Sequence, residues 1–224
     1  MDTDLFTSLA TWILYFIIYG VIGYIFEVIY CSIQAGELKN RGFLYGPVVP
    51  IYAFGALIIV ATSDWLNWPW WGNFFLCIIL CDTLEYLTSI LLEKIFHMRW
   101  WDYSKNNRFH LNGRISLRTS LCFGFGGLMI IYWMHPLIAG GVGLLPDNIA
   151  ILLAALLFGI YLMDTILSTI MAFKVKGMLD GGEIDVTAQI KKYEAHYYEV
   201  ERRKRQKRWR KYKNNLKKKF YKER

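Results

Sequence analysis

Long apolar stretches alternate with short polar segments over the first 175 residues of the chain. Five stretches are predominantly apolar and contain no lysine or arginine: residues 5–33, 51–66, 73–92, 119–136 and 149–173. A helix needs about 20 such residues to cross the hydrocarbon core of a bilayer. Because the runs are continuous instead of alternating, they favour helices over barrel strands. The pattern predicts an all-α, polytopic integral membrane bundle with five spans, of which residues 51–66 form the weakest.

The distribution of positive charge predicts the orientation of this bundle. Of the 26 basic residues, two lie in the loop 35–50, six in the loop 94–118, and 18 after Phe173. Lysine and arginine collect on the cytoplasmic side of membrane proteins, so five spans place the N-terminus outside and the C-terminus in the cytoplasm. A four-span chain that lacks residues 51–66 puts one basic loop on each side, and we reject it. The first residues carry no lysine or arginine, unlike a cleavable signal peptide, so the first stretch is expected to be a retained span.

Composition excludes several other classes of protein. Apolar and aromatic residues make up 55% of the 224 residues, which rules out a chain that is disordered throughout. With 18 glycines, 5 prolines and 4 cysteines, the chain is neither collagen-like nor a disulfide-stapled scaffold. The cysteines all fall in apolar stretches, where we expect small packing residues. Tryptophans gather at 65–71 and 100–101, as expected of aromatic anchors at the two membrane surfaces.

A basic cytoplasmic tail, residues 176–224, is predicted to follow the bundle of residues 1–175. Aromatic and aliphatic side chains recur in it at helical spacing from Trp209 to Phe220. We expect this segment to bind the anionic inner leaflet as an amphipathic helix. The residues expected to do so are Arg202, Arg203, Lys204, Arg205, Trp209, Arg210 and Lys211. Nucleic acid is a less favoured partner because the tail is tethered beside a membrane, and a solvated tail that only sets the topology stays open.

Carboxylates within the apolar stretches are the most informative residues. A carboxylate near the bilayer centre costs about 3 kcal/mol on insertion scales, so such groups usually face protein and have a function. On the third span, Asp82, Glu85, Ser89 and Glu93 fall on one helix face at 100° per residue. On the first span, Glu27 shares a face with glycines that allow a neighbouring helix to approach closely. Asp164 marks the fifth span.

These acids and the arginines of the cytoplasmic loops predict a polar cavity that opens to the cytoplasm. Guanidinium groups and carboxylates pair strongly in low dielectric. The residues expected to line the cavity are Glu27, Asn40, Arg41, Asp82, Glu85, Glu93, Asp102, Asn112, Arg114 and Asp164. The alternative is that the acid–arginine pairs are purely architectural and fix how helices and loops dock.

Three strings resemble a known bacterial membrane family: NRGFLYGPVVPIY (40–52), LEYLTSILLEKIFHMRWWDYS (84–104) and NGRISL (112–117). In family order and at family-like spacing, they are similar to the ABC-transporter type IV, or CmpB-like, permeases over roughly residues 10–137. The resemblance implies that Glu27 is the family's signature glutamate. Ala53, Ser116 and Phe123 depart from the residues common in the family. The resemblance also implies a permease subunit that works with a separate ATPase.

The strings also predict local backbone shapes. Pro47 and Pro50 disfavour helix, so residues 42–50 are expected to enter the membrane as non-helical backbone, which lines a cavity or is covered by protein. Asp102 is expected to cap a turn or pair with arginine, and Asn112-Gly113 suits a tight turn. We expect both loops to fold back over the acidic stripes and close a vestibule.

Motifs for other chemistry are missing from the sequence. It contains no GxxxxGK[ST] loop, HExxH, GxSxG or EF-hand pattern, so ATP hydrolysis requires a separate subunit, and no cofactor or metal is expected. The four histidines are dispersed and are expected at interfaces or surfaces. We predict a permease-like transporter subunit that self-associates or binds an ATPase. Two alternatives stay open: an intramembrane enzyme acting on a lipid or isoprenoid phosphate, with Mg²⁺ at Asp82 and Glu85, and a membrane scaffold or sensor.

Overall fold

The computed structural model describes residues 2–36, 42–96, 99–105 and 108–176. Its elements are α1 (Asp2–Ala35), α2 (Pro50–Leu66), α3 (Trp70–Phe96), the 3₁₀ turn η1 (Tyr103–Lys105), β1 (His110–Leu111), β2 (Ile115–Ser116), α4 (Leu117–Met129), the π-helical segment η2 (Ile130–Met134), α5 (His135–Gly143) and α6 (Asp147–Lys176). In these ranges the only sheet is the antiparallel β1–β2 hairpin, so the predicted all-α class is confirmed.

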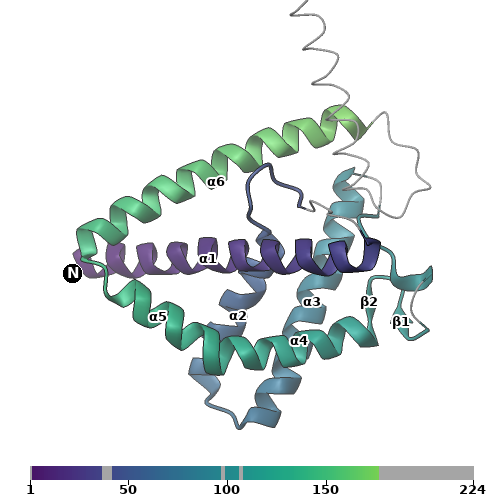
Figure 1. Ribbon diagram of the computed structural model, residues 1–224, viewed down its shortest axis with the longest axis horizontal. Coiled ribbons are helices and arrows are strands. Elements are labelled where there is room, and N and C mark those ends of the chain that lie inside the picture. The colour runs from purple at the N-terminus through teal and green to yellow at the C-terminus, as the bar shows by residue number, and fades with distance from the viewer. Residues whose placement is uncertain (1, 37–41, 97–98, 106–107, 177–224) are drawn as a thin grey trace, which may run out of the picture.

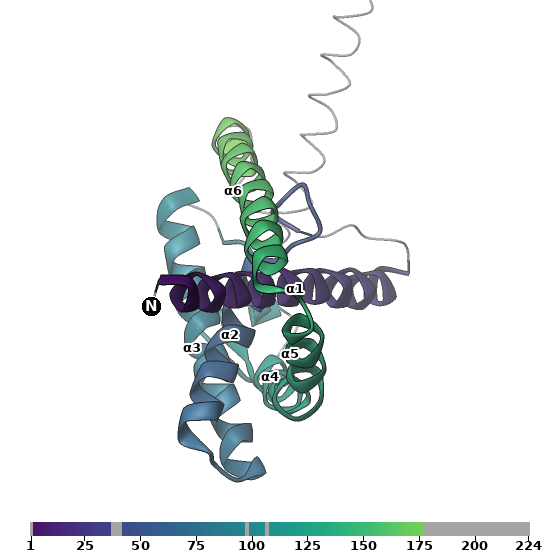
Figure 2. The ribbon, with the colours of Figure 1, turned by 90° about the vertical axis from the view of Figure 1, so that its left-hand side faces the viewer.

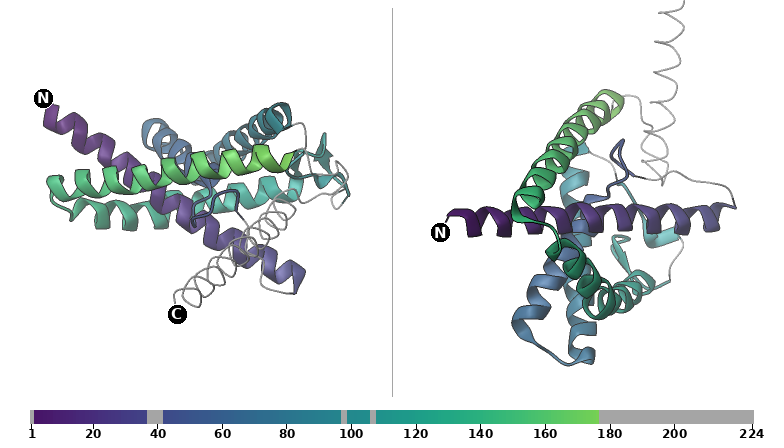
Figure 3. Two further views of the ribbon diagram at one scale, coloured as in Figure 1. Left: turned by 90° about the horizontal axis from the view of Figure 1, so that it is seen from above. Right: turned by 60° about the vertical axis from the view of Figure 1, so that its left-hand side comes forward.

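Helix α1 runs through the middle of the bundle and packs against both α2 and α6 (Figure 1). The continuous rod formed by α4, η2 and α5 lies on the other side of α1 from α6 (Figure 2). Seen from above, α1 crosses both α6 and this rod at an angle (Figure 3). Helix α3 packs against α2 and α4. The C-terminal ends of α1 and α6 and the β1–β2 hairpin lie toward the same end of the molecule, opposite the N-terminus (Figure 1).

Four helical segments among the described residues are long and apolar enough to cross a membrane. They are Asp4–Ile33 of α1, α3, the rod Leu117–Gly143, and Asp147–Phe173 of α6. Helix α2 is apolar but has only 17 residues, and so it is the weakest of the five predicted segments. By length and composition, these four helices fit the predicted membrane-embedded protein.

The fourth apolar stretch continues beyond its predicted end at Pro136. The π-helical segment η2 leads into α5, where Pro136 occupies the first turn. A proline is tolerated in a first turn, and a π-helical turn rearranges the hydrogen bonds that a proline would otherwise break. The helix therefore runs on to Gly143, and only a short connection leads to α6.

Small residues bring the helices close together, as predicted for the glycine face of α1. A Cβ at Gly20 would lie 2.6 Å from Val48, and the Gly20 carbonyl accepts a 3.0 Å hydrogen bond from the Val49 amide. A Cβ at Gly23 would likewise overlap the side chain of Tyr52 in α2. These contacts hold residues 42–49, which are non-helical as predicted, against the middle of α1.

The tight turn predicted at Asn112-Gly113 is also present. Both residues have positive φ angles, 53° and 71°, and the Arg114 amide donates to the Leu111 carbonyl at 3.0 Å. This turn joins β1 to β2. Strand β2 runs directly into α4, whose start is stabilised by a capping box between Ser116 and Thr119.

Several predicted residues lie outside the described residues. They are Asn40 and Arg41 of the first loop and the seven tail residues Arg202, Arg203, Lys204, Arg205, Trp209, Arg210 and Lys211. The predicted tail begins at the end of α6, which runs to Lys176.

Candidate functional site

The predicted polar stripe of α3 faces residues 99–105 and 108–120, which fold back over it. Ser120 of α4 donates a hydrogen bond to Asp82 Oδ2 at 2.7 Å, and Tyr103 donates to Glu85 Oε1 at 2.9 Å. Arg114 donates to Ser89 Oγ at 2.8 Å and forms an ion pair with Glu93. All four stripe residues therefore contact a loop or helix that the chain reaches only after α3 ends.

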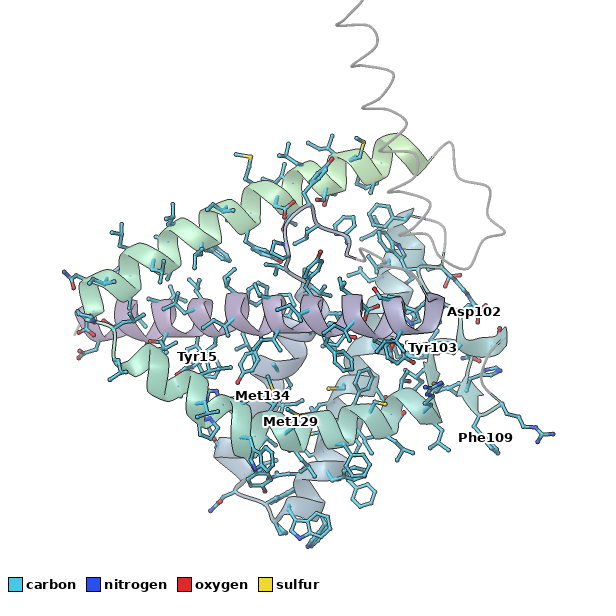
Figure 4. The ribbon with its side chains drawn as sticks, viewed as in Figure 1. Tyr15, Asp102, Tyr103, Phe109, Met129 and Met134 are labelled. Carbon is cyan, nitrogen blue, oxygen red and sulfur yellow. The ribbon has the colours of Figure 1, made fainter. Side chains whose placement is uncertain are left out.

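Glu85 is the most deeply buried acid of the stripe, with 6% of its surface exposed. Its partner Tyr103 is held in place by two local contacts. The Tyr103 amide donates to the Gly113 carbonyl at 2.8 Å, and Asp102 accepts from the Ser104 amide at 2.9 Å, which is the capping role predicted for it. Asp102 and Tyr103 lie toward the end of the bundle that carries β1 and β2 (Figure 4). The tight turn thus positions the hydroxyl that reaches into the bundle.

Glu27 of α1 has a comparable partner from α2. The Tyr52 hydroxyl donates to Glu27 Oε2 at 2.7 Å, and the Cys31 thiol approaches Oε1 at 3.5 Å. Tyr52 fits here because Gly23, one turn before Glu27, has no side chain to displace it. Tyr52 and Glu85 both lie within electrostatic range of Glu27, so the two pairs are near each other.

We call Glu27, Asp82 and Glu85 with their hydroxyl partners the acidic site. The partners are Tyr52, Ser120 and Tyr103. Each carboxylate receives one hydroxyl from a different element: α2, α4 or η1. The site therefore connects α1 to α2, and α3 to α4 and η1.

Arg114 and Glu93 form the core of a charged group at the end of α3. The Arg114 side chain is 13% exposed, and Arg99 adds contacts to Glu93 at 3.5 Å and to Asp102 at 3.8 Å. The Arg114 guanidinium also lies 5.8 Å from the ring centroid of Tyr86, a cation–π distance. Asn112 donates to the Tyr86 hydroxyl at 3.1 Å. These contacts fasten the hairpin to α3, as the architectural interpretation of the arginines expects.

Asp164 has a different set of partners from the acidic site. Its two carboxylate oxygens accept hydrogen bonds from consecutive backbone amides, Tyr45 at 2.9 Å and Gly46 at 2.8 Å. Ser168, one turn later in α6, donates to Oδ1 at 3.1 Å. Asp164 thus anchors the non-helical segment 42–49 to α6.

Sequence analysis did not single out the hydroxyl groups of the acidic site. Tyr52 and Tyr103 lie within the quoted family strings, which was the available signal, whereas Ser120 lies just beyond one. The histidines were predicted at interfaces or surfaces instead of as ligands. His135 is half-buried, and its Nδ1 lies 3.0 Å from the Tyr19 hydroxyl. Within the described ranges, no three His, Cys, Asp or Glu side chains are grouped to hold a metal ion.

Comparison with known proteins identifies the family. The family model described as "Putative ABC-transporter type IV" matches residues 14–169, which reaches beyond the predicted limit at residue 137 and includes most of α6. Searches of curated proteins and of solved structures find no match. The matched region contains all three acids of the acidic site together with their hydroxyl partners. The chain therefore belongs to the family of ABC-transporter type IV (CmpB-like) membrane proteins.

Proposed function

We propose that the protein is a permease-like subunit of a membrane transport system and that the acidic site, in a polar cavity open to the cytoplasm, receives its substrate. Family membership and four apolar helices able to span a membrane support this role. We also propose that α2 crosses the membrane as a fifth span, with the N-terminus outside and the C-terminus in the cytoplasm. This topology follows from the basic residues.

The observation that carries the proposal is the burial of Glu85 in a membrane helix with half of its carboxylate unused. Oε1 accepts from Tyr103, whereas Oε2 is buried and has no hydrogen-bond partner among the described residues. A buried polar atom without a partner costs about 1–3 kcal/mol, and more when it is charged. A purely architectural acid would use both oxygens, as Asp164 does. The unused oxygen favours a group that binds a substrate.

A separate ATPase is the proposed energy source. The family name indicates an ABC-type system, and the sequence contains no phosphate-binding GxxxxGK[ST] loop. An ATPase would bind on the cytoplasmic side, where the proposed topology places the hairpin β1–β2 and the tail. We propose that the basic tail binds the anionic inner leaflet beside it.

The test is a comparison of cells that produce the wild-type protein with cells that produce Glu85→Gln, at equal amounts in the membrane. Cells supply the energy source and the partner, and mass spectrometry measures small molecules in the cytoplasm and the medium. A transport subunit changes the distribution of at least one compound between the two compartments, and Glu85→Gln abolishes that change. Identical distributions in the two strains would contradict the proposal. An intramembrane enzyme would instead change the chemical identity of a lipid.

A further inference from the structure

We infer that the acidic site binds a primary ammonium group of its substrate, between Asp82 and Glu85. The inference rests on the proposed function for the role of the site, and it adds the chemical class of the substrate. Asp82 and Glu85 are three residues apart on α3 and lie on the same face of that helix. Their unused oxygens are the feature from which the inference follows.

Each of the two carboxylates has one oxygen bonded and one left over. Asp82 Oδ2 accepts from Ser120 and Glu85 Oε1 accepts from Tyr103. Asp82 Oδ1 and Glu85 Oε2 are both buried and have no hydrogen-bond partner in the described part of the chain. Glu85 itself is more than nine-tenths buried. Two buried carboxylate oxygens of the acidic site therefore lack a hydrogen-bond donor in the described part of the chain.

The charge of the pair is also uncompensated within the described ranges, where no lysine, arginine or histidine forms an ion pair with Asp82 or Glu85. The cation next along the stripe, Arg114, is held by Glu93 and Ser89. Two neighbouring carboxyl groups in low dielectric either take up a proton or are balanced by a counter-charge. A cationic ligand supplies both the charge and the missing donors.

The arrangement of the free oxygens selects an ammonium group over other cations. A guanidinium group prefers both oxygens of a single carboxylate, but here one oxygen of each carboxylate already accepts a hydroxyl hydrogen bond. Magnesium and calcium need about six or more oxygen ligands, and no group of three acidic, histidine or cysteine side chains is present in the described residues. A primary ammonium has three N–H donors around a compact charge, so it can bond to both carboxylates at once.

Arg114 binds the part of the polar stripe that lies toward the C-terminal end of α3. Its contact residue Ser89 lies one helical turn beyond Glu85, and Glu93 one turn further. The Arg114 guanidinium therefore binds the two polar residues that follow Glu85 on the same face of α3.

The test uses the full-length protein in phosphatidylcholine nanodiscs and measures its thermal unfolding midpoint. The probes are n-butylammonium, tetramethylammonium, which has the charge but no N–H donor, and n-butanol, which has the alkyl chain but no charge. We expect n-butylammonium to raise the midpoint and the other two to leave it unchanged, because a ligand that binds only the folded state stabilises it. The apparent dissociation constant of n-butylammonium should rise at least tenfold in both Glu85→Gln and Asp82→Asn.

The matched control is Asp147→Asn, which removes an exposed acid from the other end of the bundle and should bind n-butylammonium as the wild type does. If Glu85→Gln does not fold, the dissociation constant of n-butylammonium for Asp82→Asn tests the inference. An equal shift with tetramethylammonium, or no shift with n-butylammonium, would overturn the inference. A transported compound that has no amine would also overturn the inference, but it would support the proposed function. Ammonium binding without any redistribution of compounds in cells would support the inference and contradict the proposed function.

Discussion

The hydroxyl group of Tyr103 donates a 2.9 Å hydrogen bond to Oε1 of Glu85, a residue 18 positions earlier in the chain. The bond joins a loop after α3 to the most deeply buried acid in that helix. It depends on the turn at Gly113, whose carbonyl holds the Tyr103 amide. The position of a short hairpin is thereby coupled to the state of a carboxylate inside the bundle.

Replacing Tyr103 with Phe should destabilise the fold and weaken the site. A hydrogen bond to a charged group contributes about 1.5–3 kcal/mol, and the free energy of unfolding in mixed detergent micelles should fall by about that amount. Tyr30→Phe is the control, because the Tyr30 hydroxyl has no hydrogen-bond partner among the described residues. Tyr30 lies near the C-terminal end of α1. Equal stability of the Tyr103 variant and the wild type would show that the bond makes no net contribution to the fold.

Two neighbouring glycines in α4 give a matched test of the packing between α3 and α4. A Cβ at Gly127 would overlap the side chain of Cys77 in α3, whereas a Cβ at Gly126 would meet no atom within 4 Å. Gly127→Ala should lower the free energy of unfolding by about 1–3 kcal/mol through overpacking. Gly126→Ala should be neutral or stabilise the helix by up to about 1 kcal/mol, because alanine favours helix over glycine. Similar effects of the two substitutions would contradict the observed contact.

Helical periodicity was sufficient to predict the acidic stripe of α3 and the glycine face of α1. Both depend only on which residues share one side of a regular helix, and that follows from spacing. The turn at Asn112-Gly113 and the non-helical segment after Gly42 were predictable for a similar reason, since few residue types adopt those backbone shapes.

The partners of the acids could not be predicted in the same way. Tyr103 reaches Glu85 only because an irregular loop turns back over α3, and no spacing rule describes that path. Asp164 was expected in one cavity with the other acids, but its partners are the amides of Tyr45 and Gly46. Spacing places Asp164 on one side of α6 and says nothing about which segment covers that side.

Asp164 should be essential for holding residues 42–49 in place. An asparagine retains one carbonyl oxygen, so Asp164→Asn loses at least one of the two backbone hydrogen bonds and the charge that strengthens both. Hydrogen–deuterium exchange of the peptide 42–49 should become faster by at least tenfold. Asp147→Asn, in the exposed first turn of the same helix, should leave that exchange unchanged. Continued protection of residues 42–49 in Asp164→Asn would contradict the anchoring role.

The number of spans can be decided with single cysteines in a chain whose four native cysteines are replaced. Asn67 lies between α2 and α3, Ser104 lies in η1, and both are exposed. With five spans and the N-terminus outside, a membrane-impermeant thiol reagent added to intact cells should label Asn67→Cys. Ser104→Cys should react only after the membrane is permeabilised, because the basic loop that contains it stays in the cytoplasm.

A four-span protein in which α2 does not cross would leave a cysteine at the exposed Leu5, near the start of α1, unlabelled in intact cells if its N-terminus lies in the cytoplasm. It would reverse both results if its N-terminus stays outside. The segment before α3 would then lie in the cytoplasm and the loop 94–118 outside, so Ser104→Cys would be labelled in intact cells. Helix α2 has 17 residues, which is the lower limit of about 17–25 for a spanning helix, so length alone does not decide. Charge does, because a loop with six basic residues would be translocated against the positive-inside preference. Labelling of Asn67→Cys alone in intact cells is therefore the expected result. It would also place η1, with Tyr103, and the hairpin turn, with Arg114, on the side from which the proposed ATPase would act.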